Sequence, residues 1–425
     1  HGPVDLDSPD QIGALFFGKL GYTAVRFTKT RRCAACGKKA TKRTNYACKA
    51  HGTEHLEPVP TTNRLALDEL AELDAPEARL LRRFRKIHQL WKNFLPQISK
   101  TGPDGKVHTT FNQHGATSAR LSSAAPNLQN LPRVDNDDPD ADDPDLRGFG
   151  LRSLFLPDPG KVFVVADFDQ LELRIGAHLS GDRAMIEALC SGADLHALAA
   201  VAAFGLDCAV GDVKKLHPEK RSIAKQINFG IFYGAGWRRV MGIARCTEEK
   251  AKELLNAYFA SFPGVRAYRQ VIEAQCRERG FLRTLLGRYR HFPLIHRVGQ
   301  SPALQQRMAD DEDLRSRYHG EFRTAMNDGC QGGASDITVT CQLVADGEVV
   351  EWHPLQEDRR LLDLGAEQLL QVHDELVFQV EADAAEQAKV ALEQIMLNPV
   401  PGLRVPIKAS AGVGRTWPEA KAAGG

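Results

Sequence analysis

Uninterrupted apolar runs and segments of helical periodicity alternate along this chain. The run over 161–166 predicts a buried strand, and apolar residues on both sides of His373 predict a hairpin over 369–380. Short strands and turns are expected over 106–132, and a last strand within 404–414. Apolar residues recur with helical spacing in four regions. The first region is 8–22, with Ser8 as the helix cap, and the second is broken near Pro76 and ends at Pro96. The third is most of 190–325, and the fourth is 384–396.

Two acids lie beside the predicted strands. Asp167 follows the run at 161–166, and Asp374 lies in the polar turn of the hairpin. An acid at the end of a buried strand has a rigid base and a water-facing tip, as a metal-holding carboxylate needs, although such an Asp is more often a turn or cap residue. If the two acids meet, they can hold two Mg²⁺ ions about 3.5–4 Å apart for in-line phosphoryl transfer.

The helix expected over 219–234 combines cations and aromatic rings. Arg221, Lys225, Phe229 and Tyr233 recur every four residues and therefore follow one helical face. The cations lie toward the N-terminal end, where the helix dipole also favours anions. A nucleoside triphosphate has the same polarity, with phosphates at one end and a base at the other. The alternative is an ordinary amphipathic helix whose cations extend over buried rings.

Composition narrows the class of protein. A chain of 425 residues with 43% hydrophobic and 26% charged residues is typical of a soluble protein of two or three subdomains. The net charge of +1 means that a nucleic-acid surface must come from local patches. No apolar stretch approaches the roughly 20 residues of a membrane span. The start lacks an initiator Met and a signal peptide, as expected for a fragment, and six scattered cysteines indicate a reduced, cytoplasmic environment.

Three further cysteines form a cluster. Cys33 and Cys36 are followed, after an eleven-residue loop, by Cys48 and His51. Two such pairs predict a tetrahedral structural Zn²⁺ site, for which His55 is a competing fourth ligand. The alternatives are a reduced, flexible loop and, less favoured in a cytoplasmic protein, a disulfide.

Three motifs resemble those of family A DNA polymerases, the bacterial DNA polymerase I type. They are VFVVADFDQLELRIGAHLSGD, RSIAKQINFGIFYG and LLQVHDELVF, in the order of that family. FNQHGATSARLSSAAPNLQNLP, GFLRTLLGRYRHFP, AMNDGCQGGASD and VPIKASAGVG also match. The resemblance extends over nearly the whole chain, except the cysteine cluster and the acidic stretch 135–145, which we expect to be flexible.

The resemblance implies an α+β right-hand fold, with an antiparallel-sheet palm, helical fingers and a helical thumb. The expected domains are a thumb over 1–98, truncated at its start and carrying the cysteine insertion at about 30–57, palm over 99–190, fingers over 191–329 and palm again over 330–425.

The implied activity is template-directed DNA synthesis, in which deoxynucleotides are added to a primer 3′-hydroxyl with two Mg²⁺ or Mn²⁺ ions. Asp167, Asp374 and the Phe168 carbonyl would hold the metals, with Glu375 as an accessory carboxylate and Lys225 as a catalytic cation. The implied nucleotide contacts are Arg221, Lys225, Phe229, Tyr233, His196, Gln170 and Glu172, the last as a steric gate against ribose. The implied DNA contacts are Arg120, Asn127, Gln129, Asn130, Arg174, Gln331, Gln371 and His373.

Three residues depart from the family pattern. Phe168 stands where Tyr is usual, Asp169 where Ser is common, and Ala119 where Gly is usual. Asp169 adds a negative charge beside the metals unless it turns to solvent or to an arginine.

The expected partners are primer-template DNA and deoxynucleoside triphosphates, bound by a monomer without membrane association. The cations between the cysteine pairs suggest that zinc holds a basic knuckle against duplex phosphates. Two other functions remain open: a related polymerase with relaxed sugar or template choice, and a catalytically inactive nucleic-acid clamp.

Overall fold

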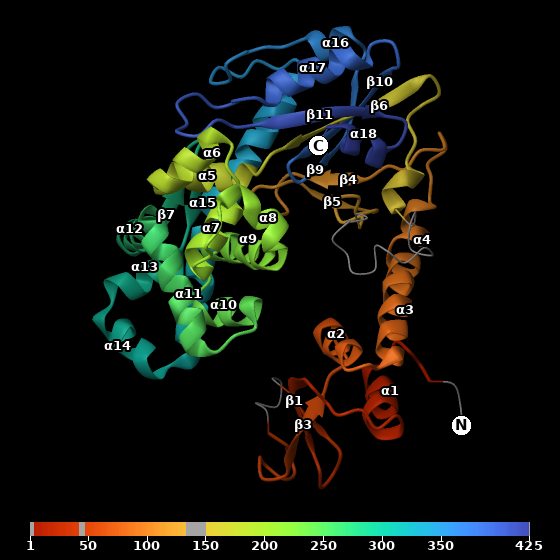
Figure 1. Cartoon of the computed structure of the whole chain (residues 1–425). Helices are drawn as coiled ribbons and strands as arrows, with labels where there is room; N and C mark the ends of the chain where they lie inside the picture. Colours follow the sequence, from red (N-terminus) through yellow and green to blue (C-terminus); the bar gives the residue numbers. More distant parts are fainter. Residues whose placement is uncertain (1–3, 42–46, 133–149, 425) are drawn as a thin grey trace. The chain divides into compact units, whose positions relative to one another are not determined.

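The computed structural model describes residues 4–41, 47–132 and 150–424, which divide into two compact units at His108 (Figure 1). The predicted acidic stretch lies outside these residues. Helices and antiparallel sheets are mixed in both units, so the predicted α+β class is confirmed. None of the described helices is both long enough and apolar enough to cross a membrane.

The first unit joins a small helical core to a three-stranded sheet. Ser8 caps the first helix by accepting from the Gln11 N–H, as predicted. The helices are α1 (Pro9–Gly13), which continues as a π-helical turn (Ala14–Lys19), α2 (Arg64–Glu72), α3 (Pro76–Asn93) and α4 (Leu95–Ile98). Their apolar faces bury Ile12, Phe16, Leu67 and Leu70. The strands β1 (Phe27–Cys33), β2 (Lys39–Ala40) and β3 (Leu56–Pro60) form a sheet of order β2-β1-β3, which the sequence did not predict.

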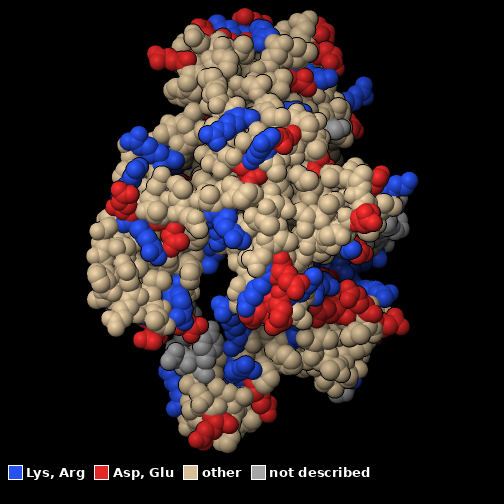
Figure 2. Space-filling model, turned by 60° about the vertical axis from the view of Figure 1, so that its left-hand side comes forward, with Lys and Arg blue, Asp and Glu red and all other residues tan. Residues whose placement is uncertain are grey.

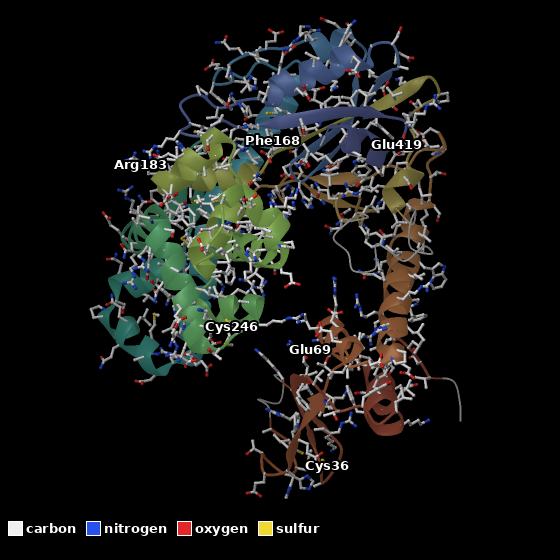
Figure 3. All side chains as sticks on the ribbon, viewed as in Figure 1. Cys36, Glu69, Phe168, Arg183, Cys246 and Glu419 are labelled. Carbon is white, nitrogen blue, oxygen red and sulfur yellow. The ribbon has the colours of Figure 1, made fainter. Side chains whose placement is uncertain are left out.

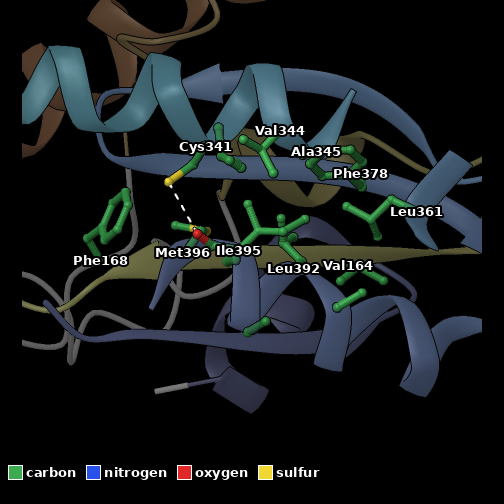
Figure 4. Close-up of a cluster of buried hydrophobic side chains, with 14 of the residues drawn as sticks. Val164, Phe168, Cys341, Val344, Ala345, Leu361, Phe378, Leu392, Ile395 and Met396 are labelled. Carbon is green, nitrogen blue, oxygen red and sulfur yellow. Dashed lines mark hydrogen bonds between the residues drawn. The ribbon is translucent and has the colours of Figure 1, made fainter. Parts of the chain in front are cut away.

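The second unit is built on an antiparallel sheet of order β11-β6-β10-β9. Its strands are β6 (Lys161–Phe168), β9 (Glu367–Val372), β10 (Glu375–Glu381) and β11 (Ala409–Gly414). Val164 and Phe378 on one face pack against α15 (Glu312–Ala345) and α17 (Ala385–Met396), as Figure 4 shows. The opposite face carries α18 (Trp417–Gly424). Because both faces are covered, β6 is apolar from Val162 to Ala166 rather than alternating.

A helical region follows β6, as predicted. It comprises α5 (Leu171–Ser180), α6 (Arg183–Ser191), α7 (Leu195–Phe204), α8 (Val213–Leu216), α9 (Pro218–Phe232), α10 (Trp237–Ala244), α11 (Glu248–Ser261), α12 (Pro263–Arg279), α13 (Pro293–Gln300) and α14 (Pro302–Asp310). The hairpin of β7 (Phe281–Arg283) and β8 (Tyr289–His291) interrupts it. Strands β4 (Thr110–Asn112) and β5 (Ser122–Ala124) form a separate pair, and α16 (Arg360–Asp363) precedes β9.

Candidate functional site

The two acids singled out by the sequence lie on neighbouring strands. Asp167 pairs with Glu375 in the β6–β10 ladder, and the Phe168 N–H donates to the Asp374 carbonyl at 3.4 Å. Asp167 is therefore inside β6, whereas the sequence predicted that it follows the strand. Asp374 occupies the two-residue turn between β9 and β10, where His373 has a φ of 62°. The strand pairing thus brings together two carboxylates that are far apart in sequence.

The environment of these acids disfavours their negative charge. Burial, followed by the charge of Asp374, raises the pKa of Asp167 to about 6. Burial likewise raises the pKa of Asp374. Among the described residues, the buried Oδ1 atom of Asp167 has no hydrogen-bond partner. A buried, unpartnered carboxylate oxygen beside a second acid is a suitable environment for a divalent cation.

Glu375 has a different environment from the one predicted. It is fully buried, and its Oε1 accepts from the Trp417 Nε1 at 2.6 Å and from Arg152 at 3.4 Å. Lys421 donates to the other oxygen and also to Asp167. Both oxygens are therefore engaged by protein groups, so Glu375 fits a positioning role better than an accessory metal ligand.

Three residues of this network, Arg152, Trp417 and Lys421, were missed by the sequence analysis. Trp417 and Lys421 lie four residues apart on α18, and that spacing is the only signal the sequence offers. Helix α18 packs closely against β11 because Gly412 of that strand has no side chain. A Cβ at this position would lie 2.1 Å from the Ala420 carbonyl oxygen.

The face of α9 singled out by the sequence borders an open cleft. Lys225, Phe229 and Tyr233 line a cavity of 1170 Å³ together with side chains of α10, α12 and α15. The Phe229 and Tyr233 rings lie 6.3 Å apart. Arg221 instead donates through Nε to Asp194 at 2.5 Å, so its predicted phosphate contact depends on its two terminal nitrogens.

Glu172, the predicted steric gate, is held between two partners. Arg120 donates to it at 2.5 Å, and the Tyr233 hydroxyl donates to its other oxygen. Burial, with the Glu172 charge as a second cause, raises the pKa of Tyr233, which therefore stays a neutral donor. Glu172, the predicted steric gate, is thus hydrogen-bonded to Tyr233, a predicted nucleotide contact.

His196, a predicted nucleotide contact, is enclosed by protein. It is 5% exposed, and its Nδ1 lies 3.1 Å from the Asn228 Nδ2. Burial lowers its pKa to about 4, so the imidazole is neutral near pH 7 and supplies no positive charge.

Three predicted DNA contacts are instead buried supports. Gln129 donates to the carbonyl and side-chain oxygens of Gln371, both at 3.0 Å. Arg174 is 3% exposed and donates to the Asp169 carboxylate at 2.6 Å and to the Pro406 carbonyl at 2.9 Å. The negative charge that Asp169 adds is therefore paired with Arg174. Because these side chains are enclosed by protein, they are not placed to contact DNA.

The other candidates are more accessible. Asn130, His373 and Gln170 are exposed, whereas Asn127 and Gln331 are half-buried. Gln331 accepts from Asn327 at 2.9 Å, and Asn127 accepts from the Asn130 N–H at 3.1 Å. The nucleotide contact of Gln170 and the DNA contacts of the other four residues stay predictions.

The cysteine cluster also comes together, in the first unit. One ligand atom each from Cys33, Cys36, Cys48 and His51 lies within 4.8 Å of the others. His55 is not part of this group, so the geometry favours His51 over His55 as the fourth ligand. Figure 3 labels Cys36 beside β1. A hydrogen bond from the Ala50 N–H is the main cause that lowers the pKa of the Cys48 thiol to about 6.

The chain is similar to known proteins over nearly its whole length. The sequence model of DNA polymerase family A matches residues 1–419. The chain is 34% identical over 425 residues to the thermostable DNA polymerase I of Thermus filiformis and 31% identical over 421 residues to DNA polymerase I of Pseudomonas aeruginosa. These matches include 99% and 98% of this chain, which spans only 42% and 38% of the two relatives.

A solved structure is also similar. It is described as the POL domain of Pol1 from M. smegmatis in complex with DNA primer-template and dNTP. The TM-score is 0.73 at 29% identity, over 99% of this chain and 62% of that chain. The fold predicted from the motifs is thereby confirmed. The chain belongs to DNA polymerase family A.

Proposed function

We propose that this chain is a DNA-directed DNA polymerase that extends a primer 3′-hydroxyl with deoxynucleotides. The observation that carries the proposal is the pairing of Asp167 with the segment that holds Asp374, which leaves a buried carboxylate oxygen without a partner. Membership of family A and the similar domain described with primer-template and dNTP support the choice of substrates.

Two Mg²⁺ ions, or Mn²⁺ ions in their place, fit the proposed acid site. Asp167, Asp374 and the Phe168 carbonyl are the proposed ligands. Such ions supply Lewis acidity, which favours ionisation of the primer hydroxyl and neutralises charge on the triphosphate. Glu375, Lys421 and Trp417 hold Asp167 in place from the side of α18.

The cleft beside α9 is the proposed nucleotide site. The exposed ammonium of Lys225 neutralises the triphosphate, and Phe229 packs against the sugar and base. Glu172 closes the space at the sugar 2′ position because Arg120 and Tyr233 fix its carboxylate. We therefore expect deoxynucleotides to be incorporated in preference to ribonucleotides, and competition between the two in primer extension measures this preference.

A second cofactor is proposed in the first unit. Cys33, Cys36, Cys48 and His51 fit one structural Zn²⁺ ion, because thiolate and imidazole are its preferred ligands.

Primer extension by the wild type and by Asp374→Ala tests the polymerase proposal. The variant is expected to lose about 10³-fold or more in rate, because a metal-holding carboxylate is removed. Asp383→Ala, at an exposed acid of the same unit, is the matched control and should retain the wild-type rate. Equal extension by Asp374→Ala and the wild type would contradict the proposed site. DNA binding without extension by the wild type would favour the inactive clamp.

A further inference from the structure

The cysteine cluster is presented by two backbone turns of the same form. Both follow a ligand-x-x-ligand-Gly pattern, from Cys33 to Gly37 and from Cys48 to Gly52. In each turn the glycine N–H donates to the carbonyl of the first cysteine, at 2.7 and 2.8 Å. The glycines have φ of 69° and 60°, in the left-handed region that other residues enter only with strain. Each turn therefore directs two ligands toward one point.

The distances between the ligand atoms fit the edges of a tetrahedron. Zn–S and Zn–N bonds of about 2.3 and 2.1 Å require edges of about 3.8 Å between two sulfurs and about 3.6 Å between sulfur and nitrogen. The Cys36 and Cys48 sulfurs lie 3.5 Å apart, and the His51 Nδ1 lies 3.5 Å from the Cys33 sulfur and 3.8 Å from the Cys48 sulfur. A disulfide requires sulfurs about 2.05 Å apart, so the Cys36–Cys48 distance excludes one in this structure.

The described part of the segment that carries these turns lacks an apolar core. We call the described residues 27–41 and 47–60 the ribbon; it contains β1, β2 and β3. Among its described residues, the buried apolar side chains are Cys33, Ala40 and Cys48. Phe27, its largest apolar residue, is 51% exposed. Three short strands without a hydrophobic face need another source of stability, and a metal ion provides it in small domains.

One face of β1 is cationic and open. Lys29 and Arg31 alternate with Thr28 and Thr30, and both cations are exposed. Ion pairs with Asp10 engage Arg32 and Lys39. Within the described part of the chain, no ion pair involves Lys29 or Arg31. Exposed cations beside an exposed aromatic ring are suited to the sugar-phosphate backbone of nucleic acids.

We propose that one Zn²⁺ ion replaces the missing core of the ribbon and so holds a cationic face that binds the phosphates of duplex DNA. The inference rests on the zinc site and the primer-template partner of the proposed function. It does not depend on the chemistry of nucleotide addition. The four residues of the cysteine cluster are different from the acids of the proposed polymerase site. Zinc and DNA grip are therefore separable from nucleotide addition.

Metal analysis of the full chain tests the first half. Protein isolated without added metal should contain about one zinc per chain. Cys33→Ser with Cys36→Ser, and also His51→Ala, should lose it, whereas His55→Ala, the matched control, should retain it. The assignment would be overturned if the wild type bound no zinc after refolding with Zn²⁺. It would also be overturned if His55→Ala lost as much zinc as His51→Ala.

Dissociation from a primer-template duplex tests the second half. The double variant Lys29→Ala with Arg31→Ala should keep zinc but dissociate faster from the duplex. The slope of log affinity against log salt concentration should be smaller in magnitude by about 2, because two phosphate contacts are lost. The double cysteine variant should also dissociate faster, yet insert a single nucleotide at the wild-type rate once bound.

Unchanged DNA affinity and product length in both variants would overturn the DNA role. Failure of insertion by the wild type itself would instead contradict the polymerase proposal, so the two failures can be distinguished.

Discussion

The two main sheets of this protein are both antiparallel, but they are stabilised in different ways. The β11-β6-β10-β9 sheet of the second unit buries Val164 and Phe378 completely or nearly so against helices. In the β2-β1-β3 sheet of the first unit, β1 alternates exposed and half-buried residues and ends in the buried Cys33. Apolar burial therefore stabilises the sheet of the second unit, whereas the sheet of the first unit depends on the zinc ion that we propose.

The difference has a consequence for function. A sheet covered on both faces is rigid enough to hold like-charged carboxylates together, at a cost in stability that the surrounding core offsets. A sheet held by ligands can instead leave its faces to charged groups. Over the view in Figure 2, lysine and arginine are interspersed with acids, consistent with the net charge of +1. A local cationic face such as that of β1 therefore indicates a nucleic-acid surface better than the total charge does.

The largest effect expected on stability comes from Phe378→Ala. The ring is 2% exposed, so its removal leaves a cavity and should lower the free energy of unfolding by about 3–5 kcal/mol. Urea unfolding measures this loss, which should be the same with and without a zinc chelator. Leu56→Ala in β3, where the side chain is half-buried, is the control and should cost less than about 1 kcal/mol. Similar losses in both variants would contradict the proposed difference between the sheets.

A smaller effect, on rate, is expected from Lys421→Met. Its ammonium holds Asp167 and Glu375 together, and loss of such a supporting group costs about 10–100-fold in activity or metal affinity. Single-turnover insertion and Mn²⁺ binding measure the effect. Lys389→Met on α17, where the half-buried lysine pairs with Glu386, is the matched control. A wild-type rate and wild-type Mn²⁺ affinity for Lys421→Met would show that α18 does not position the acids.

Asp167→Asn should stabilise the metal-free protein at pH 8. The folded pKa of Asp167 is about 6 against an ordinary value of 3.8, so its ionised form disfavours folding above pH 6 and the penalty disappears below about pH 4. The full shift corresponds to about 3 kcal/mol, and a side chain that is 29% exposed should yield about 1–2 kcal/mol. Thermal unfolding in EDTA at pH 8 and pH 4 measures the gain. An equal gain at both values would rule out this origin.

The smallest effect is expected from Phe27→Ala in the ribbon. Because the ring is 51% exposed, its loss should change the free energy of unfolding by less than about 0.5 kcal/mol and leave the zinc content unchanged. Chemical unfolding and metal analysis together check this. A loss as large as that of Phe378→Ala would reveal an apolar core in the ribbon.

Local patterns predicted much of the fold and of the site. The run at 161–166, the hairpin turn with Asp374 and the helix of Lys225 were recognisable because periodicity reports burial within a single element. The strands of the ribbon were not, since Thr, Lys and Arg give no alternating signal. The buried positions of Gln129, Gln371 and Arg174 were also missed, because other elements enclose these side chains.

The sequence by itself determined the family, the two acids that meet on neighbouring strands and the three cysteines of the cluster. Only the tertiary structure selected His51 over His55, turned Asp169 toward Arg174 and placed Lys421 between two acids. The reason is physical: chemical type and spacing are encoded locally, whereas the partner of a buried charge is chosen by whichever distant segment packs against it.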